Sequence, residues 1–175
     1  MTTNLACDCG AVTLAVDERP IIAATCYCTS CRTAGERLAS LTDSPVGPDG
    51  GTAYVLYRKD RVRFTSGQER LRAFRLKPDS PTRRVVATCC NTPIFVEFKD
   101  GHWLSLYSAL WPEGQRPAPE LRTMTGDLPE GAPLHGDLPA GTLPTLGFYA
   151  RLLGAWIAMG FKVPKVQVGG EELRI

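Results

Sequence analysis

The sequence predicts a mainly β fold with an extended arm and one helix at its C-terminal end. Short apolar or alternating runs of strand length fill the first two-thirds of the chain. Seven of the 14 prolines then fall between residues 111 and 144, and an apolar segment of helix length follows them. We therefore expect a β domain at 1–108, a Pro/Gly-rich arm at 109–144, and a helix with a tail at 145–175.

The expected strands are short segments rich in β-branched and aromatic residues, at 11–16 (AVTLAV), 61–65 (RVRFT), 93–98 (PIFVEF) and 103–107 (WLSLY). Ser66 and Gly67 separate two such runs within residues 61–77, which predicts a hairpin there. The alternation of that segment breaks after Arg72, and a bulge near Ala73 would account for the break.

The C-terminal third contains an arm and a helix. With 5 of the 17 glycines added to its prolines, the segment 111–144 is not expected to hold a regular core element. We expect it to wrap its own domain or a second subunit. The run at 145–161 carries one charge, Arg151, which would cost roughly 2.5–3.5 kcal/mol at the centre of a membrane span. We therefore expect no membrane span but a helix docked on the core or paired across a homodimer, followed by a tail with one short strand.

Composition and charge limit the function classes. A formal net charge of +2 is too small to indicate a nucleic-acid partner. The first residues, MTTNLACDCGAV, have neither a basic start nor a long apolar run, so we expect a cytoplasmic protein. In a reducing compartment, clustered cysteines are more often metal ligands or catalytic thiols than disulfides.

A basic segment and two histidines offer further candidates. Residues 58–84 hold ten of the 20 Lys and Arg residues against three acids. This segment is either a solvated strand face protected by arginine or a cationic face that binds carboxylates or phosphate. We expect His102, beside Trp103, to be structural or exposed, and His135 to lie in the arm.

The segment CYCTSC provides three closely spaced thiols, Cys26, Cys28 and Cys31. Since zinc–thiolate bonds are about 2.3 Å long and the ion is tetrahedral, a tight loop can wrap three such thiols around one ion. Arg32 could offset the net negative charge. Three ligands leave a fourth position for water or substrate, as in a catalytic zinc site. The alternative is that a cysteine from elsewhere closes the tetrahedron.

The remaining four cysteines could form a second site, in which Cys7 and Cys9 supply one half and Cys89 and Cys90 the other. Neighbouring residues of an extended chain point to opposite faces, so the later pair needs a sharp turn. Asn91 tolerates such backbone angles. Coordination by three thiolates and an empty, reduced site are the alternatives, so we expect one or two Zn²⁺ ions per chain.

The motifs CDCG (7–10), CYCTSC (26–31) and CCNTPIF (89–95), in this order, resemble those of the glutathione-dependent formaldehyde-activating (GFA) enzyme and centromere protein V family. The resemblance covers roughly residues 5–107 and implies several coiled antiparallel β-sheets around zinc sites. It also implies a structural zinc at the first C-x-C and a late C-x-x-C-G, with a catalytic zinc at the middle triad. Cys7 and Cys9 match the first pair, and Cys26, Cys28 and Cys31 match the triad.

The late motif departs from the family pattern. Aligning Cys90 and Asn91 with the family's Cys-Gly places Ala87 where the other cysteine belongs. Either Cys89 substitutes after a local shift of the backbone, or fewer protein thiolates hold that zinc.

The resemblance implies a zinc-dependent carbon–sulfur lyase that acts on a small thiol adduct of the glutathione–formaldehyde kind. The substrate would be held at the open zinc of Cys26, Cys28 and Cys31. One alternative is a non-catalytic binding module stabilised by zinc. Another is a thiol redox protein that uses a strained disulfide between Cys89 and Cys90.

Overall fold

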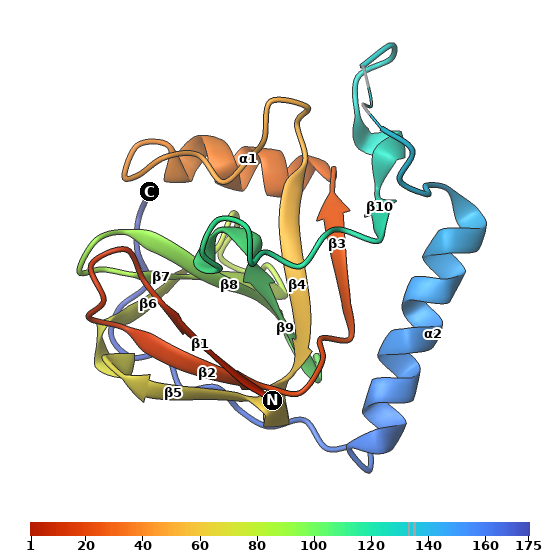
Figure 1. Ribbon diagram of the computed structural model, residues 1–175. Coiled ribbons are helices and arrows are strands. Elements are labelled where there is room, and N and C mark those ends of the chain that lie inside the picture. The colour runs from red at the N-terminus through yellow and green to blue at the C-terminus, as the bar shows by residue number, and fades with distance from the viewer. Residues whose placement is uncertain (133, 135) are drawn as a thin grey trace.

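The computed structural model describes residues 1–132, 134 and 136–175, so the expected position of His135 lies outside the described residues. Within them, two β-sheets and two α-helices confirm the mainly β fold, although one helix was expected (Figure 1). The smaller sheet is antiparallel in the order β1-β2-β5, formed by Thr2–Ala6, Thr13–Asp17 and Val62–Ser66.

The larger sheet has the strand order β10-β3-β4-β9-β8-β7-β6. Its neighbouring strands are antiparallel except for β10 and β3, which are parallel. In that order its strands are Leu121–Thr123, Ile22–Cys26, Thr52–Arg58, Trp103–Tyr107, Thr92–Phe98, Thr82–Ala87 and Leu71–Phe74.

Two hydrophobic cores lie on opposite faces of the larger sheet. Because side chains alternate along a strand, Val55 and Tyr57 of β4 join the core that faces the smaller sheet. Tyr54 and Leu56 join the core on the other face, with helix α1 (Thr29–Leu38) and Leu152 of α2 (Thr142–Ala158). Burial on both faces explains why β4 is almost continuously apolar.

The predicted hairpin at 61–77 is wrong. The strand β5 pairs with β2 in the smaller sheet, whereas β6 pairs with β7 in the larger one. Gly67, in the left-handed conformation (φ 68°), and the 3₁₀ turn Gln68–Arg70 carry the chain between the sheets. The alternation breaks because Ala73 and Phe74 are both buried in β6, and β6 pairs in register, without the predicted bulge.

The expectation of an arm without regular structure is also wrong in part. Leu121–Thr123 forms β10, which adds a parallel strand to the edge of the sheet beside β3. Leu121 is buried there, and the backbone NH of Glu120 donates to the carbonyl of Ala23. The guanidinium of Arg122, which lies within β10, donates to the carbonyls of Gly136 and Leu138 farther along the arm. These bonds fasten the arm to this edge of the sheet.

The predicted helix at 145–161 is present as α2, which begins at Thr142 and ends at Ala158. His102, which is buried, shares a 2.8 Å hydrogen bond with the Leu152 carbonyl through its Nε2 atom, and Arg151 forms an ion pair with Glu120. Large apolar side chains remain exposed on α2, namely Leu143, Leu146, Tyr149, Leu153 and Ile157. Pairing of this helix across a dimer stays a prediction.

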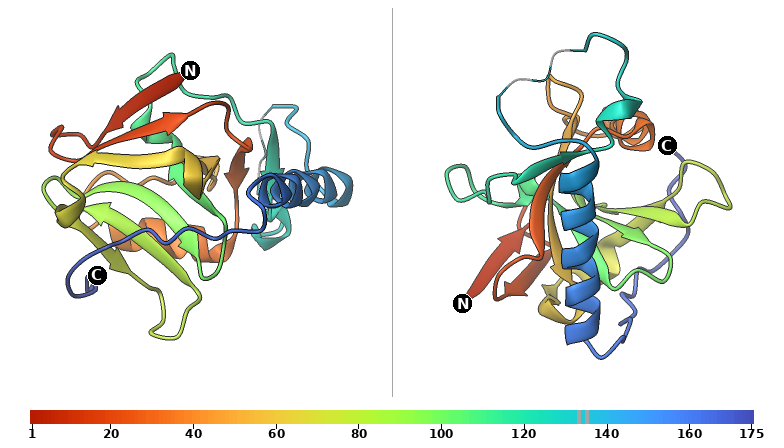
Figure 2. Two further views of the ribbon diagram at one scale, coloured as in Figure 1. Left: turned by 90° about the horizontal axis from the view of Figure 1, so that it is seen from below. Right: turned by 90° about the vertical axis from the view of Figure 1, so that its right-hand side faces the viewer.

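The C-terminal tail, residues 162–175, was expected to supply a strand, and the structure assigns it none. It crosses the underside of the sheets instead (Figure 2, left). Val166 and Val168 pack on the core between the sheets, and the Leu173 backbone NH donates to the carbonyl of Ala73. Among the described residues, no helix is long and apolar enough to cross a membrane.

A buried ion pair should contribute strongly to stability. Lys59 Nζ lies 2.5 Å from Glu97 Oε1, and both side chains are less than 10% exposed. Glu97→Gln leaves the Lys59 charge buried without its partner, so we expect a loss of about 3 kcal/mol of unfolding free energy in urea titrations. In the matched control Asp60→Asn, which breaks the exposed pair with Arg58, the loss should stay below about 1 kcal/mol. Equal losses would contradict this account.

Candidate metal centres

The three cysteines of CYCTSC meet where a strand passes into a helix. Cys26 is the last residue of β3, Cys28 is the N-cap of α1, and Cys31 lies in the first helical turn. The expected tight loop is therefore a helix start, and α1 was missed. Apolar residues with helical spacing, Cys31, Ala34 and Leu38, were the available signal, and all three are buried.

The spacing of the three sulfurs fits a zinc site. All three lie within 4.8 Å of one another, and the Cys26 and Cys31 sulfurs are 3.8 Å apart. Two bonds of about 2.3 Å at a tetrahedral angle would place two sulfurs about 3.8 Å apart. A disulfide requires about 2.05 Å, and the three cysteines are free.

In the described part of the chain, no fourth Cys, His, Asp or Glu joins the triad. The close polar neighbours are hydroxyls: Tyr54 donates to Cys31 Sγ at 3.6 Å, and Ser30 Oγ lies 3.3 Å from Cys28 Sγ. The three cysteines also line a cavity of about 880 Å³. The triad thus offers three ligands beside a space that a small molecule can enter.

The three thiols of the triad differ in acidity. Hydrogen bonds with the Cys26 and Cys31 side chains lower the pKa of Cys28 to about 2, with help from Ser30 and the Cys31 backbone NH. The hydrogen bond with Cys28 and burial raise the pKa of Cys26, and hydrogen bonds with Cys26 and Cys28 raise the pKa of Cys31. A metal cation would favour the ionised form of all three thiols.

Arg84 of β7 is a second cation near the triad, besides Arg32. Arg32 donates to the backbone carbonyls of Tyr27 and Asp127, which joins α1 to the arm. Arg84 is 2% exposed and lines the cavity, and its Nη2 donates to the Ser30 carbonyl at 2.9 Å and the Ser30 hydroxyl at 3.3 Å. Because the strand partners of β7 determine this position, no local pattern in the sequence indicated it.

Most other arginines of the basic segment form ion pairs with acids of the same chain. Examples are Arg58 with Asp60, Arg61 with Glu18, Arg63 with Asp17 and Arg75 with Glu172. This pairing favours the interpretation of a solvated strand face. Of the ten basic residues in the segment, all of which the structure describes, Arg84 is the one that lines the cavity.

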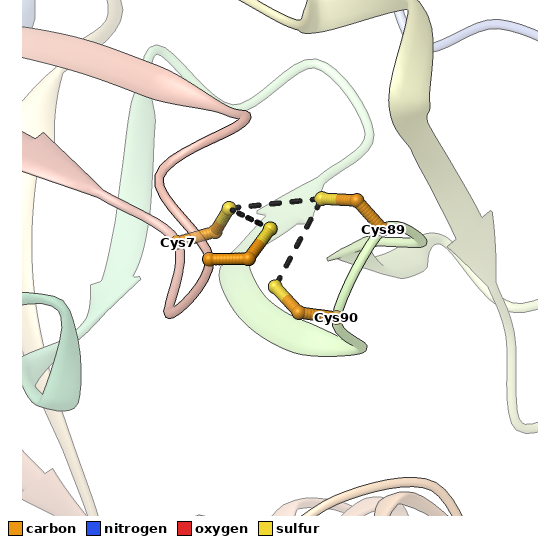
Figure 3. A group of neighbouring side chains, drawn as sticks. Cys7, Cys89 and Cys90 are labelled. Atoms are coloured by element: carbon orange, nitrogen blue, oxygen red, sulfur yellow. Dashed lines mark hydrogen bonds between the residues drawn. The ribbon is translucent and has the colours of Figure 1, made fainter.

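The other four cysteines form a second cluster. Their sulfurs all lie within 4.8 Å of one another. Cys7 Sγ is 3.6 Å from Cys9 Sγ and 3.7 Å from Cys89 Sγ, and Cys89 Sγ is 3.9 Å from Cys90 Sγ. Figure 3 shows Cys7 facing Cys89 and Cys90 across the gap between two turns. These spacings again match the separation of about 3.8 Å in a tetrahedral zinc–thiolate site.

Two turns bring the four sulfurs together. After β1, Gly10 in the left-handed conformation (φ 75°) closes a turn in which its NH donates to the Cys7 carbonyl. Between β7 and β8, Asn91 adopts φ 61°, which is the sharp bend that Cys89 and Cys90 need. The geometry therefore favours the alternative in which Cys89 replaces the family's cysteine after a local shift of the backbone. Ala87, which aligns with that cysteine, is buried in β7.

The second cluster also holds thiols of unequal acidity. Burial and hydrogen bonds with Cys9 and Cys7 raise the pKa of Cys89 to about 12. Burial opposes ionisation of Cys90, but hydrogen bonds from Thr92 and from the Cys9 backbone lower its pKa to about 6. Four sulfur donors are the ligand set of a closed, structural zinc site.

Comparison with known proteins agrees with this arrangement. The family model described as glutathione-dependent formaldehyde-activating enzyme (GFA) matches residues 2–123, which include all seven cysteines. The chain belongs to the GFA family. The resemblance seen in the motifs is thereby confirmed, and the match extends past residue 107 through β10, whereas α2 and the tail follow it.

One solved structure similar to this GFA chain is titled as a protein of Rhodobacter sphaeroides, a structural genomics target. It is 18% identical, with a TM-score of 0.47, and the alignment covers 66% of this chain and 92% of that one. No curated protein sequence matches this chain.

Proposed function

We propose that this chain is a zinc-dependent carbon–sulfur lyase that forms or cleaves the bond between the sulfur of a small thiol and the carbon of an aldehyde. The observation that supports the proposal is the three-sulfur site of Cys26, Cys28 and Cys31, which has no fourth ligand among the described residues and lies beside a cavity. The name of the family, which includes glutathione and formaldehyde, supports the same reaction class.

The two cysteine clusters would have different roles. Cys26, Cys28 and Cys31 would hold the zinc that meets substrate, and Cys7, Cys9, Cys89 and Cys90 would hold a structural zinc. When bound, a zinc ion with three thiolate ligands supplies a soft Lewis acid that favours a sulfur atom as its fourth ligand.

The reaction requires no oxidant or reductant. In the synthetic direction the thiol loses its proton, its sulfur adds to the carbonyl carbon, and the carbonyl π electrons move to oxygen. The oxygen then takes up one proton, which gives a thiohemiacetal, and cleavage is the reverse of these steps. The protein holds the sulfur and the aldehyde close together and so lowers the entropic cost of their meeting.

Arg84 would assist by its charge. Its guanidinium is one hydrogen-bonded link, through Ser30 Oγ, from Cys28 Sγ. In a buried site, a cation at this distance stabilises both a substrate thiolate and the alkoxide that forms when sulfur adds to the carbonyl.

The proposal is tested by NMR exchange spectroscopy on mixtures of formaldehyde with a panel of small thiols that includes glutathione. The zinc-loaded protein should increase the exchange rate between free and adduct thiol in proportion to its concentration for at least one thiol. Protein stripped of metal by a chelator is the control and should not increase it. Rates equal to the uncatalysed rate for every thiol would contradict the proposal.

A further inference from the structure

The cavity beside the triad has walls that are mostly carbon. It lies between one face of the larger sheet and the inner face of α2. Large apolar side chains from both sides line it, among them Val96, Trp103, Phe148, Tyr149, Leu152 and Trp156. Its charged lining residues other than Arg84, namely Lys99, Asp100 and Asp127, are exposed.

The apolar wall on the α2 side is held in a defined position. The hydrogen bond from His102 to the Leu152 carbonyl fixes the middle of the helix against the sheet. The Trp156 ring stacks on the His102 ring, with centroids 5.6 Å apart and planes inclined by 7°. Since α2 begins at Thr142, after the matched residues 2–123, this wall is an addition to the part that the family match covers.

Two of the lining residues carry a buried nitrogen without a hydrogen-bond partner among the described residues, namely Nε of Arg84 and Nε1 of Trp156. Both atoms are covered by their neighbours, so neither offers an accessible donor to a ligand in the cavity. The accessible walls therefore match a molecule with a largely apolar body.

We infer that the thiol used at this site carries an apolar alkyl or aryl body that packs against α2. This inference rests on the proposed function, in which the sulfur lies at the triad, and it names the substrate class of that site. Glutathione suits the cavity less well, because its two carboxylates, ammonium and two amides would lose water against apolar side chains without enough partners.

The first test uses the wild-type protein and isothermal titration calorimetry. The zinc-loaded protein is titrated with ethanethiol, butanethiol and hexanethiol, and with glutathione. Burial of each added methylene should raise the affinity roughly fourfold until the cavity is filled. Glutathione should bind more weakly than hexanethiol. A flat series, or tighter binding of glutathione, would overturn this inference and leave the proposed function standing.

A pair of substitutions on opposite faces of α2 tests whether the cavity side of this helix determines the affinity for the longer thiol. Phe148→Ser, on the cavity side, should weaken the binding of hexanethiol about tenfold and leave that of ethanethiol nearly unchanged. Leu153→Ser, on the exposed side, is the control and should bind both thiols as the wild type does. Equal effects of the two substitutions would overturn the inference. Failure of every thiol to bind the wild type would overturn both the inference and the proposed function.

Discussion

Cys28→Ser is expected to remove one zinc ion and to abolish the acceleration of thiol–aldehyde exchange, while the melting temperature stays within about 3 °C of the wild type. Cys28 has two roles, since its sulfur is a predicted zinc ligand and also caps α1 by accepting from the Cys31 backbone NH at 3.3 Å. Serine is among the best N-cap residues, so the substitution removes the ligand and keeps the cap. Metal analysis, calorimetric melting and the exchange assay measure the three outcomes.

Cys28→Ala provides the matched control. It removes the cap together with the ligand, so it should lose the same zinc ion and about 1 kcal/mol more unfolding free energy than Cys28→Ser. A large loss of stability in Cys28→Ser itself would mean that the zinc of the triad is structural. That result would favour the non-catalytic binding module.

Cys7→Ser should have the larger effect on stability. Cys7 is 3% exposed, and its sulfur meets that of Cys89, so the cluster links the turn after β1 to the turn between β7 and β8. Because metal binding to a closed site contributes free energy to the folded state, we expect the loss of one zinc ion and at least about 3 kcal/mol of unfolding free energy. For a chain of this size that loss lowers the melting temperature by roughly 10 °C.

The comparison of Cys7→Ser with Cys28→Ser separates the roles of the two clusters, because both variants exchange one thiol for a hydroxyl. Urea unfolding with and without a chelator is the measurement. The chelator should destabilise the wild type to the level of Cys7→Ser and change that variant much less. If the two variants are equally stable, the assignment of one structural and one catalytic site is wrong.

The sequence predicted those parts of the site that depend on local spacing. Cys26, Cys28 and Cys31 lie within one strand–helix junction, so their separation in sequence already limits the separation of their sulfurs. The grouping of Cys7 with Cys89 was predicted because four cysteines remain, as two pairs, once the triad is set aside. The turn at Asn91 makes this grouping geometrically possible. The positions of Arg84 and α2 depend on tertiary contacts, which local spacing does not encode.

The errors in the fold have the same origin. β5 and β6 are neighbours in sequence, which predicted a hairpin, but β5 pairs with β2 in the smaller sheet and β6 pairs with β7 in the larger one. β10 is three residues long, and among the described residues its strand neighbour is β3, far away in the chain, so a local pattern could not reveal it. α1 was missed because Cys31 belongs both to the metal-ligand spacing of CYCTSC and to the apolar face of the helix, and only the ligand spacing was considered.

The most direct test of the open three-sulfur site is X-ray absorption spectroscopy at the zinc edge, with and without hexanethiol. One site of four sulfurs and one of three should give an average of about 3.5 sulfur neighbours per zinc, which should rise to about 4 when the thiol is added. An average of four before the thiol is added, or no change after it, would contradict an open triad that accepts a sulfur substrate.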